Sequence, residues 1–177
     1  MPRRVRTKPT LPAVKVQTEA MEIFLVRHAK AEPGQDDAAR RLTQKGREAA
    51  EAVARLLRRQ GVSVARIEHS PLVRARETAE IIGRRIGSPL AESADLRPEA
   101  DVGAVRQRLF DDPGGSVVLV GHNPFVGTLA GLLLAEDEKA AILSFHTGSV
   151  ARLISVPSGL GWRFTCDWLI TPALVSM

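Results

Sequence analysis

Residues 22–28 read EIFLVRH, a short apolar run that ends directly in Arg27 and His28. An unbroken apolar run of this length is typical of a strand that is buried on both faces. In open α/β sheets, ligands bind just beyond the carboxyl ends of such strands. This stretch therefore predicts a buried first strand and a polar pair at the sheet edge where a site would form.

Strand-like and helix-like segments alternate along the rest of the chain, which predicts an α/β domain. Further strands are expected at residues 64–68, 89–92, 117–120, 150–156 and 162–169, the last two paired as a hairpin. Helices are expected from Thr43 to about Gln60, from a Ser70-Pro71 cap to Gly87, over residues 101–110, and from an Asn123-Pro124 cap through Leu134. The pattern favours a three-layer α/β/α sandwich with a mostly parallel central sheet.

The positive charge of the chain is concentrated in its first twenty residues. The 177 residues carry a net charge of +5, and residues 1–20 hold five cations and one anion, which leaves +1 for the remainder. A generally basic domain that coats nucleic acid is therefore not expected. We interpret residues 1–20 as a basic disordered extension, or as the result of a start codon placed too early, with Met21 as the true start. Residues 21–177 are expected to form a single domain.

Several protein classes are excluded by what the sequence lacks. The single Cys166 rules out an internal disulfide framework and a multi-cysteine zinc site, and it is interpreted as a small buried residue in a cytoplasmic protein. The longest apolar stretch, residues 126–135, is about half of the ~20 residues that a membrane span requires. No membrane partner is expected. The oligomeric state is left open, with a monomer slightly favoured.

Polar residues follow three of the expected strands, and they are mostly cationic or imidazole side chains. Arg27 and His28 follow the first strand, Arg74 comes shortly after the second, and His122 follows the strand at 117–120. This set has surplus positive charge and no obvious carboxylate partner nearby in the sequence, which suits a phosphate dianion. A neutral imidazole can serve as nucleophile and form a phosphohistidine that water then hydrolyses. No histidines have the tight spacing of metal ligands, so neither a metal nor a cofactor is expected.

Four motifs in this order resemble those of the histidine phosphatase superfamily, which has the phosphoglycerate mutase-like fold. They are residues 25–29 (LVRHA), residues 40–43 with Gly46 (RRLT…G), residues 70–79 (SPLVRARETA) and residues 120–124 (VGHNP). The second motif resembles an element of the SixA-type phosphohistidine phosphatases, whose small size this chain shares. Two departures stand out: Ala29 replaces the commoner glycine, and Arg41 replaces the usual proline, so the loop that carries Arg40 is expected to be less rigid.

The resemblance implies a role for each residue of the site. It makes His28 the nucleophile, with a phosphohistidine enzyme intermediate. It implies that the phosphoryl oxygens are held by Arg27, Arg40, Arg74 and His122. The general acid that protonates the leaving group would be Asp95, with Glu99 as a second candidate.

The resemblance also implies an activity, and three readings of it stay open. The first is a metal-independent phosphatase that removes phosphate from phosphohistidine on a signalling protein of the phosphotransfer (HPt) type or on a phosphocarrier protein. The second is a small-molecule phosphomonoesterase or mutase of the same superfamily. The third is a phosphate-binding module without catalytic turnover. Intact Arg27, His28, Arg74 and His122 argue against the third.

Overall fold

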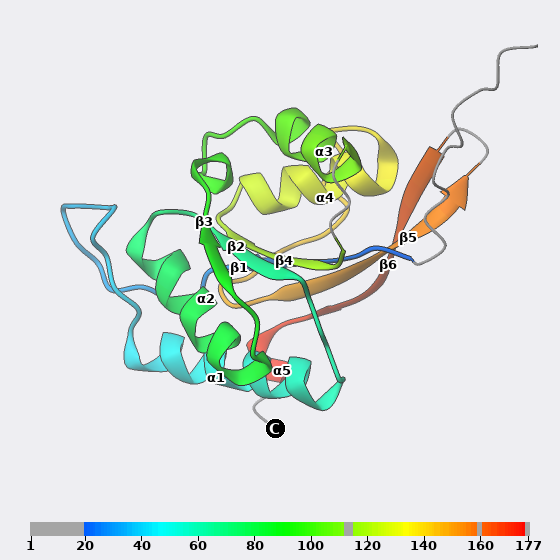
Figure 1. Ribbon diagram of the computed structural model, residues 1–177. Helices are drawn as coiled ribbons and strands as arrows, with labels where there is room; N and C mark the ends of the chain where they lie inside the picture. Colours follow the sequence, from blue (N-terminus) through cyan, green and yellow to red (C-terminus); the bar gives the residue numbers. More distant parts are fainter. Residues whose placement is uncertain (1–19, 112–114, 159–160, 176–177) are drawn as a thin grey trace, which may run out of the picture.

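The computed structural model describes residues 20–111, 115–158 and 161–175, and a central sheet of six strands organises them (Figure 1). The strand order across the sheet is β3-β2-β4-β1-β5-β6. The strands are β1 (Glu22–Arg27), β2 (Arg66–His69), β3 (Leu90–Glu92), β4 (Val117–Gly121), β5 (Val150–Ser158) and β6 (Gly161–Ile170). β1, β2, β3 and β4 are parallel to one another, whereas β5 pairs antiparallel with both β1 and β6. The expected mostly parallel sheet and the expected hairpin are both confirmed.

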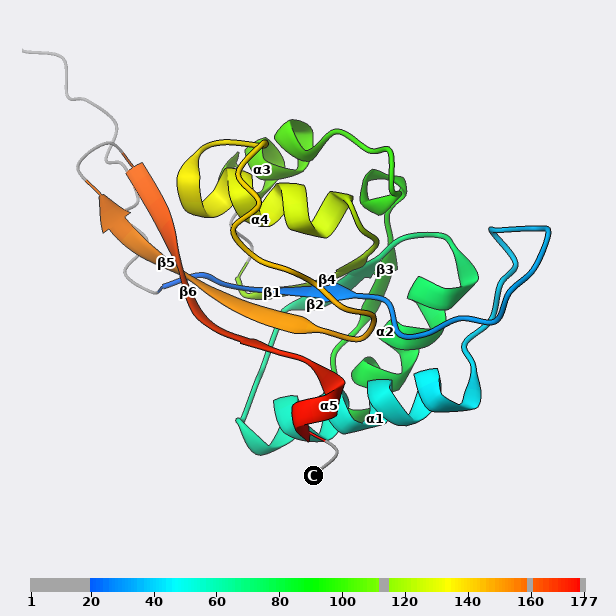
Figure 2. The ribbon, with the colours of Figure 1, turned by 180° about the vertical axis from the view of Figure 1, so that it is seen from behind.

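Helices cover both faces of the sheet and complete the expected three-layer sandwich. They are α1 (Gln44–Arg59), α2 (Val73–Ile86), the 3₁₀ helix η1 (Ala94–Leu96), α3 (Val102–Asp111), α4 (Phe125–Ala135) and α5 (Pro172–Val175). α3 and α4 lie on one face, and α1, α2 and α5 lie on the other, as the front and back views show (Figures 1 and 2). The α/β/α architecture is therefore confirmed.

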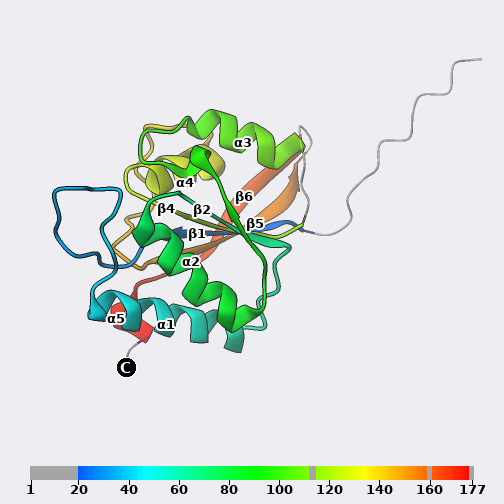
Figure 3. The same cartoon turned by 60° about the vertical axis from the view of Figure 1, so that its left-hand side comes forward.

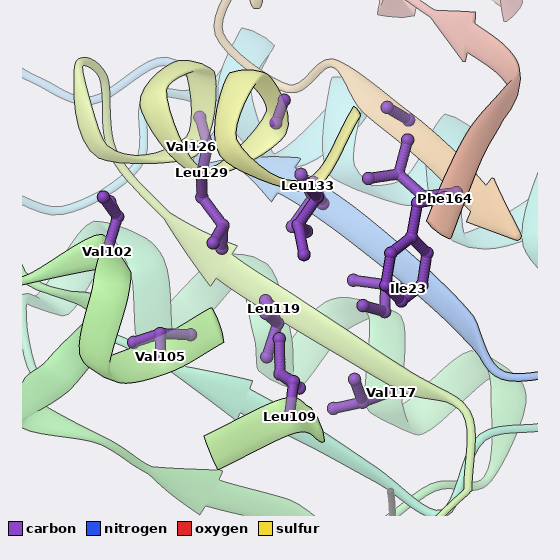
Figure 4. Packing of buried hydrophobic residues seen from close by; sticks show 14 of the residues in the cluster. Ile23, Val102, Val105, Leu109, Val117, Leu119, Val126, Leu129, Leu133 and Phe164 are labelled. Carbon is purple, nitrogen blue, oxygen red and sulfur yellow. The ribbon is translucent and has the colours of Figure 1, made fainter. Parts of the chain in front are cut away.

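The apolar run of β1 is buried on both sides because its side chains alternate between two cores. Ile23 and Leu25 join a cluster with residues of α3 and α4, whereas Phe24 and Val26 join a second cluster with residues of α1 and α2. Figure 4 shows the first cluster, in which Leu119 of β4 lies among side chains of the two covering helices. Full burial of such side chains contributes roughly 1.5–3 kcal/mol each, so the two cores hold β1 firmly in the middle of the sheet.

Some expected helix caps are correct and others are not. Thr43 caps α1 by accepting a hydrogen bond from the Gly46 amide at 2.9 Å, and Gly87 ends α2 in the left-handed conformation. The expected Ser70-Pro71 cap is wrong, because α2 begins two residues later than expected, at Val73, with Leu72 as its N-cap. Asn123 does not cap α4 either: the helix begins after Pro124, and the Asn123 amide donates to the Phe145 carbonyl at 3.0 Å.

Two further expectations concern the ends of the chain. Residues 1–19, which contain all the cations of the proposed basic extension, lie outside the described residues. Cys166 is exposed on β6, so its interpretation as a small buried residue is wrong. Within the described part of the chain, none of the helices is long and apolar enough to cross a membrane.

The topology brings the connections that follow the parallel strands to one edge of the sheet. The carboxyl ends of β1 and β2 both lie beside the carboxyl end of β4. The connection of residues 28–43 extends outward from this edge (blue in Figure 3). It returns beside the start of α2, where the Val73 amide donates to the Ala38 carbonyl at 3.0 Å. This edge is where the sequence places the candidate site.

Candidate active site

His28 is fixed at the carboxyl end of β1 with one ring nitrogen facing the site. Its backbone amide donates to the Gly121 carbonyl at 2.9 Å, and its Nδ1 lies 2.7 Å from the Ala29 carbonyl oxygen. A carbonyl only accepts, so Nδ1 carries the proton and Nε2 keeps its lone pair. That lone pair accepts a hydrogen bond from Nε of Arg74 at 3.2 Å. The arrangement suits Nε2 for nucleophilic attack.

Burial and positive charge keep the His28 ring neutral. Desolvation lowers the pKa of His28 to about 4. The hydrogen bond to Ala29 opposes this shift, and the positive charges of Arg74, Arg27 and Arg40 add to it. A neutral imidazole is the reactive form, since a protonated ring has no free lone pair. His28 is therefore neutral at neutral pH, the form that a nucleophilic role would require.

His122 lies beside His28 and has polar atoms that nothing in the protein satisfies. The two ring centroids are 4.9 Å apart, and only 2% of His122 is exposed. Neither ring nitrogen has a hydrogen-bond partner among the described residues. Desolvation, together with the nearby His28 and Arg74, lowers the pKa of His122 to about 3. An unsatisfied buried polar group costs roughly 1–3 kcal/mol, so this ring is poised to contact a ligand.

Arg27 enters the site from the last position of β1. Its Nη1 donates to the Phe145 carbonyl at 2.7 Å, the same carbonyl that accepts from Asn123. Its Nε is buried and has no partner in the described part of the chain. Burial lowers the pKa of the Arg27 guanidinium. Like His122, Arg27 therefore has a buried N–H group that is available to bind a ligand.

Arg74, in the first turn of α2, joins His28 to a carboxylate that sequence reasoning missed. Besides its contact with His28, Arg74 donates through Nη1 to the Asp37 carbonyl at 2.6 Å and through Nη2 to Asp37 Oδ2 at 3.0 Å. The carboxylate partner of this cationic set thus comes from a distant part of the sequence. Asp37 and Arg74 are 37 positions apart, and no local pattern indicates such a pairing.

Arg40 reaches the same carboxylate from the other side. Its Nη1 lies 2.9 Å from Asp37 Oδ1, and its Nε donates to the Glu32 carbonyl at 2.7 Å. Hydrogen bonds from Arg40 and Arg74 lower the pKa of Asp37, so the carboxylate stays ionised. The structure thus brings Arg40 to the site through Asp37.

The connection that carries Arg40 and Asp37 is tied to α2 by Glu77. This carboxylate accepts from Arg41 Nε at 2.7 Å and from the Leu42 amide at 2.8 Å. Burial alone would raise the pKa of Glu77, but these hydrogen bonds outweigh it and hold the pKa below its usual range. Arg41, which stands where the resembled motif usually has proline, therefore ties this connection to α2 by an ion pair. Next to Glu77, the Thr78 hydroxyl accepts from the Ala29 amide at 3.1 Å and positions the residue after His28.

The two general-acid candidates lie on the segment after β3. Asp95 is an exposed residue of η1, and Glu99 is an exposed residue shortly after it. η1 is held near the site edge, because the Ser93 amide donates to the His69 carbonyl at 2.9 Å. The Leu96 carbonyl oxygen would lie 3.4 Å from a Cβ added at Gly121, the residue before His122. Asp95 thus lies on a segment near the carboxyl edge of the sheet, where His28 and His122 are found, and its role as general acid stays a prediction.

The charges of these residues suit an oxyanion better than a metal ion. Arg27, Arg40 and Arg74 contribute three positive charges and Asp37 one negative charge, while both imidazoles are neutral, so the net charge is +2. A phosphoryl dianion would balance this charge. Among the described residues there is no group of three His, Cys, Asp or Glu side chains that could hold a metal ion.

Comparisons with known proteins agree with this geometry. The sequence profile of the histidine phosphatase superfamily (branch 1) matches residues 23–112. Phosphohistidine phosphatase SixA of Escherichia coli (strain K12) is 31% identical over 165 residues, which cover 89% of this chain and 98% of that protein. An uncharacterised protein of Picosynechococcus is 36% identical over 164 residues, 85% of this chain and 99% of that protein.

A solved structure shows the same fold. The protein histidine phosphatase SixA complexed with tungstate superposes with a TM-score of 0.76 at 28% identity, covering 88% of this chain and 99% of that one. The fold, the motifs and the site therefore agree with the sequence relationship: this protein belongs to the histidine phosphatase superfamily and is an enzyme of the phosphatase class.

Proposed function

We propose that this protein hydrolyses phosphohistidine through a phosphorylated His28, without a metal ion. The observation that carries the proposal is the position of His28 Nε2, whose lone pair faces Arg74 Nε at 3.2 Å beside the unsatisfied ring of His122. A nucleophile and free donors thus meet at one point. The tungstate bound in the similar SixA structure is, like phosphate, a tetrahedral oxyanion.

The reaction has two displacements at phosphorus. In the first, Nε2 of His28 forms a bond to phosphorus while the bond to the leaving nitrogen breaks, and that nitrogen keeps the electron pair and takes up a proton. In the second, water attacks the same phosphorus and the Nε2–P bond breaks, which releases inorganic phosphate. The bond between Nδ1–H and the Ala29 carbonyl keeps the ring oriented through both steps.

Charge stabilisation supplies most of the catalysis in this proposal. Phosphoryl transfer depends mainly on positioning and on stabilising the charge of the transferred group. Enzymes commonly lower their barriers by about 8 kcal/mol or more, and one preorganised donor is worth roughly 2.7–4 kcal/mol. Arg27, Arg74 and His122, assisted by Arg40, could together account for an effect of this size.

Protonation of the leaving group is assigned to the acidic segment after β3. Asp95 is our first choice and Glu99 the alternative, because both carboxyl groups are exposed on a segment held at the carboxyl edge of the sheet. A phosphohistidine substrate needs little help from an acid, since protonated imidazole is already a good leaving group. Loss of Asp95 should therefore slow hydrolysis of phosphate esters more than hydrolysis of phosphohistidine.

The proposed substrate is a phosphorylated protein, either an HPt-type signalling domain or a phosphocarrier, in the cytoplasm. The name of the Escherichia coli relative, phosphohistidine phosphatase, supports this choice. The short connections that border the site also support it: residues 70–72 and 122–124 join strands to helices directly, and residues 93–101 contain only η1. A site bordered in this way can accept a side chain that projects from another protein.

Trapping the intermediate tests the nucleophile. Brief exposure to a labelled phosphodonor should label the wild type through an acid-labile, base-stable bond, and His28→Ala should not be labelled. His146→Ala is the matched control, because this exposed histidine should leave labelling unchanged. Equal labelling of His28→Ala would refute the assignment.

A substrate panel tests the leaving group. We expect the phosphorylated HPt domain or phosphocarrier to be hydrolysed with a far higher kcat/KM than phosphorylated metabolites. A metabolite that is hydrolysed faster would instead favour a small-molecule phosphatase. Chelators should leave activity unchanged, and activity that is lost with a chelator and restored by zinc or magnesium would refute the metal-independent mechanism.

A further inference from the structure

Asp37 is an anion built into the mouth of a cationic site. Both of its carboxylate oxygens are bound to phosphate-site arginines, Oδ1 to Arg40 at 2.9 Å and Oδ2 to Arg74 at 3.0 Å. The Arg74 guanidinium that binds Asp37 also donates to Nε2 of His28, so the carboxylate lies one guanidinium away from the nucleophile. The side chain of Asp37 is nevertheless 61% exposed, which puts it on the outer side of that guanidinium.

The position of this carboxylate is set by its own loop. Asp36 Oδ1 accepts from the amides of Ala38 and Ala39 at 3.0 and 3.4 Å, which forms a tight turn around Asp37. The Ala38 carbonyl in turn accepts from the Val73 amide at the start of α2. The charge of Asp37 is therefore held at a fixed place. It acts to raise the pKa of His122, although burial and the neighbouring His28 and Arg74 have larger effects and lower that pKa overall.

The location of Asp37 matters for the group that leaves phosphorus. An in-line attack by Nε2 of His28 pushes the leaving group away from the nucleophile, toward the exposed side of the site. A phosphoryl dianion already balances the net +2 charge of the site. A leaving group that carries a further negative charge would then face the carboxylate of Asp37 without compensation. The imidazole of phosphohistidine is cationic when protonated and leaves as a neutral ring, so it would meet no repulsion from this carboxylate.

We propose that Asp37 is a specificity-determining residue that disfavours substrates with anionic leaving groups and favours the imidazole of phosphohistidine. This inference rests on the proposed phosphatase function and adds to it the means by which one class of substrate is selected. It makes the site selective against phosphorylated carboxylic acids, although the same arginines would bind their phosphoryl group.

The test compares two phosphate esters that differ in one carboxylate: glycerol 3-phosphate, which releases neutral glycerol, and 3-phosphoglycerate, which releases an anion. Their kcat/KM values are measured for the wild type, Asp37→Asn and Asp36→Asn. We expect Asp37→Asn to raise the value for 3-phosphoglycerate relative to glycerol 3-phosphate by roughly tenfold, or about 1.4 kcal/mol. The same variant should lower the preference for a phosphohistidine peptide over 3-phosphoglycerate.

Asp36→Asn is the matched control, because it removes an equal charge from the same loop and keeps an oxygen to accept from Ala38 and Ala39. We expect it to change the ester ratio by less than about twofold. A purely structural role for Asp37 would change kcat/KM for all substrates alike. An unchanged ester ratio in Asp37→Asn, no gain in 3-phosphoglycerate turnover, or an equal change in Asp36→Asn would overturn the inference.

The ester pair contains no imidazole, so it decides the role of Asp37 separately from the proposed substrate. A wild-type enzyme that does not hydrolyse phosphohistidine would refute the proposed function, and the ester ratio would still report on Asp37. Conversely, efficient phosphohistidine hydrolysis with an unaltered ester ratio in Asp37→Asn would refute only the specificity role.

Discussion

At the scale of single residues, the two adjacent imidazoles are buried without becoming charged. His28 and His122 are 9% and 2% exposed, and three arginines lie around them. Desolvation disfavours the protonated form of each ring, and the nearby positive charges act in the same direction. The protein thereby keeps both rings neutral at neutral pH, and in acid the folded state loses stability because the rings resist protonation.

That loss gives a prediction on stability. The folded-state pKa values of His28 and His122, about 4 and about 3, lie below the ordinary value of 6.5, so the unfolded chain binds more protons in acid. Their contribution is full above about pH 6.5 and is lost as the pH falls toward the folded-state values. In urea titrations, the unfolding free energy of the wild type should fall between pH 7 and pH 5. The fall in His122→Gln should be smaller by roughly 1–2 kcal/mol.

The comparison of His122→Gln with the wild type at the two pH values decides this prediction. If His122→Gln follows the wild type, then His122 is not held neutral by the fold.

At the scale of elements, Glu77 couples α2 to the connection of residues 28–43. It is 7% exposed and bonds to the Leu42 amide as well as to Arg41 and Arg47. Glu77→Gln removes the charge of this group while keeping its shape. We expect a loss of roughly 1–3 kcal/mol in unfolding free energy and a higher KM, because Arg40 and Asp37 lie on the loosened connection. Chemical denaturation and steady-state kinetics measure the two effects.

Glu80→Gln is the matched control on the same helix. Glu80 forms a half-exposed ion pair with Arg76 at 3.7 Å, the pairing expected from their i, i+4 spacing. Exposed pairs contribute about 0–1 kcal/mol, so this variant should change neither stability nor KM appreciably. Similar losses in the two variants would contradict a special role for Glu77.

Gly46 fixes how closely α1 approaches the same connection. A Cβ added at this position would lie 2.1 Å from the Lys30 carbonyl oxygen, a backbone atom that cannot move independently. Gly46→Ala should therefore lower the unfolding free energy by roughly 1–3 kcal/mol and also reduce kcat/KM. Gly127→Ala on α4 should be neutral or slightly stabilising, because its nearest neighbour would be 4.0 Å away. Equal thermal stabilities for Gly46→Ala and Gly127→Ala would show that the close approach of Gly46 to the Lys30 carbonyl does not limit the stability of the protein.

At the scale of the whole molecule, the pairing of β1 with β5 extends one residue beyond β1, to Met21, which directly follows the basic segment of residues 1–20. The Met21 amide donates to Ser155 Oγ at 2.7 Å, and its carbonyl accepts from the Ser155 amide at 2.9 Å. A protein that begins at Met21 keeps both bonds, so we expect its hydrolysis rate to stay within about twofold of the full chain. Any salt-dependent binding of nucleic acid should disappear with the five cations.

A protein that begins at Ile23 is the control for this truncation. It lacks Met21, which is 8% exposed and belongs to the core cluster shared with α3 and α4, so it should unfold at a lower temperature. Loss of hydrolysis in the protein that begins at Met21 would show that the first twenty residues take part in the reaction.

Local features of the chain were readable from the sequence because a few neighbouring residues encode them. The alternating burial of residues 22–26, the Thr43 cap and the left-handed Gly87 each depend on side chains within one turn or one strand. Their order predicted the mixed sheet and its covering helices. Two of the cap predictions failed, at Ser70 and Asn123. The start of α2 is bound by a distant segment, because the Val73 amide donates to the Ala38 carbonyl, and the Asn123 side chain donates to the Phe145 carbonyl instead of capping α4.

The sequence by itself thus predicted the layered fold, the family and a cationic set at one edge of the sheet. Arg27, His28, Arg74 and His122 come together there because each follows a parallel strand at its carboxyl end. Only the tertiary structure decided how these residues are supported and balanced. Asp37 meets Arg74 across 37 positions, and Glu77 meets Arg41 across 36. Such pairs form only where a connection folds back onto a helix, and no periodicity or cap signals that return. The physical reason is that local patterns specify elements, whereas the charge inside the site depends on contacts between them.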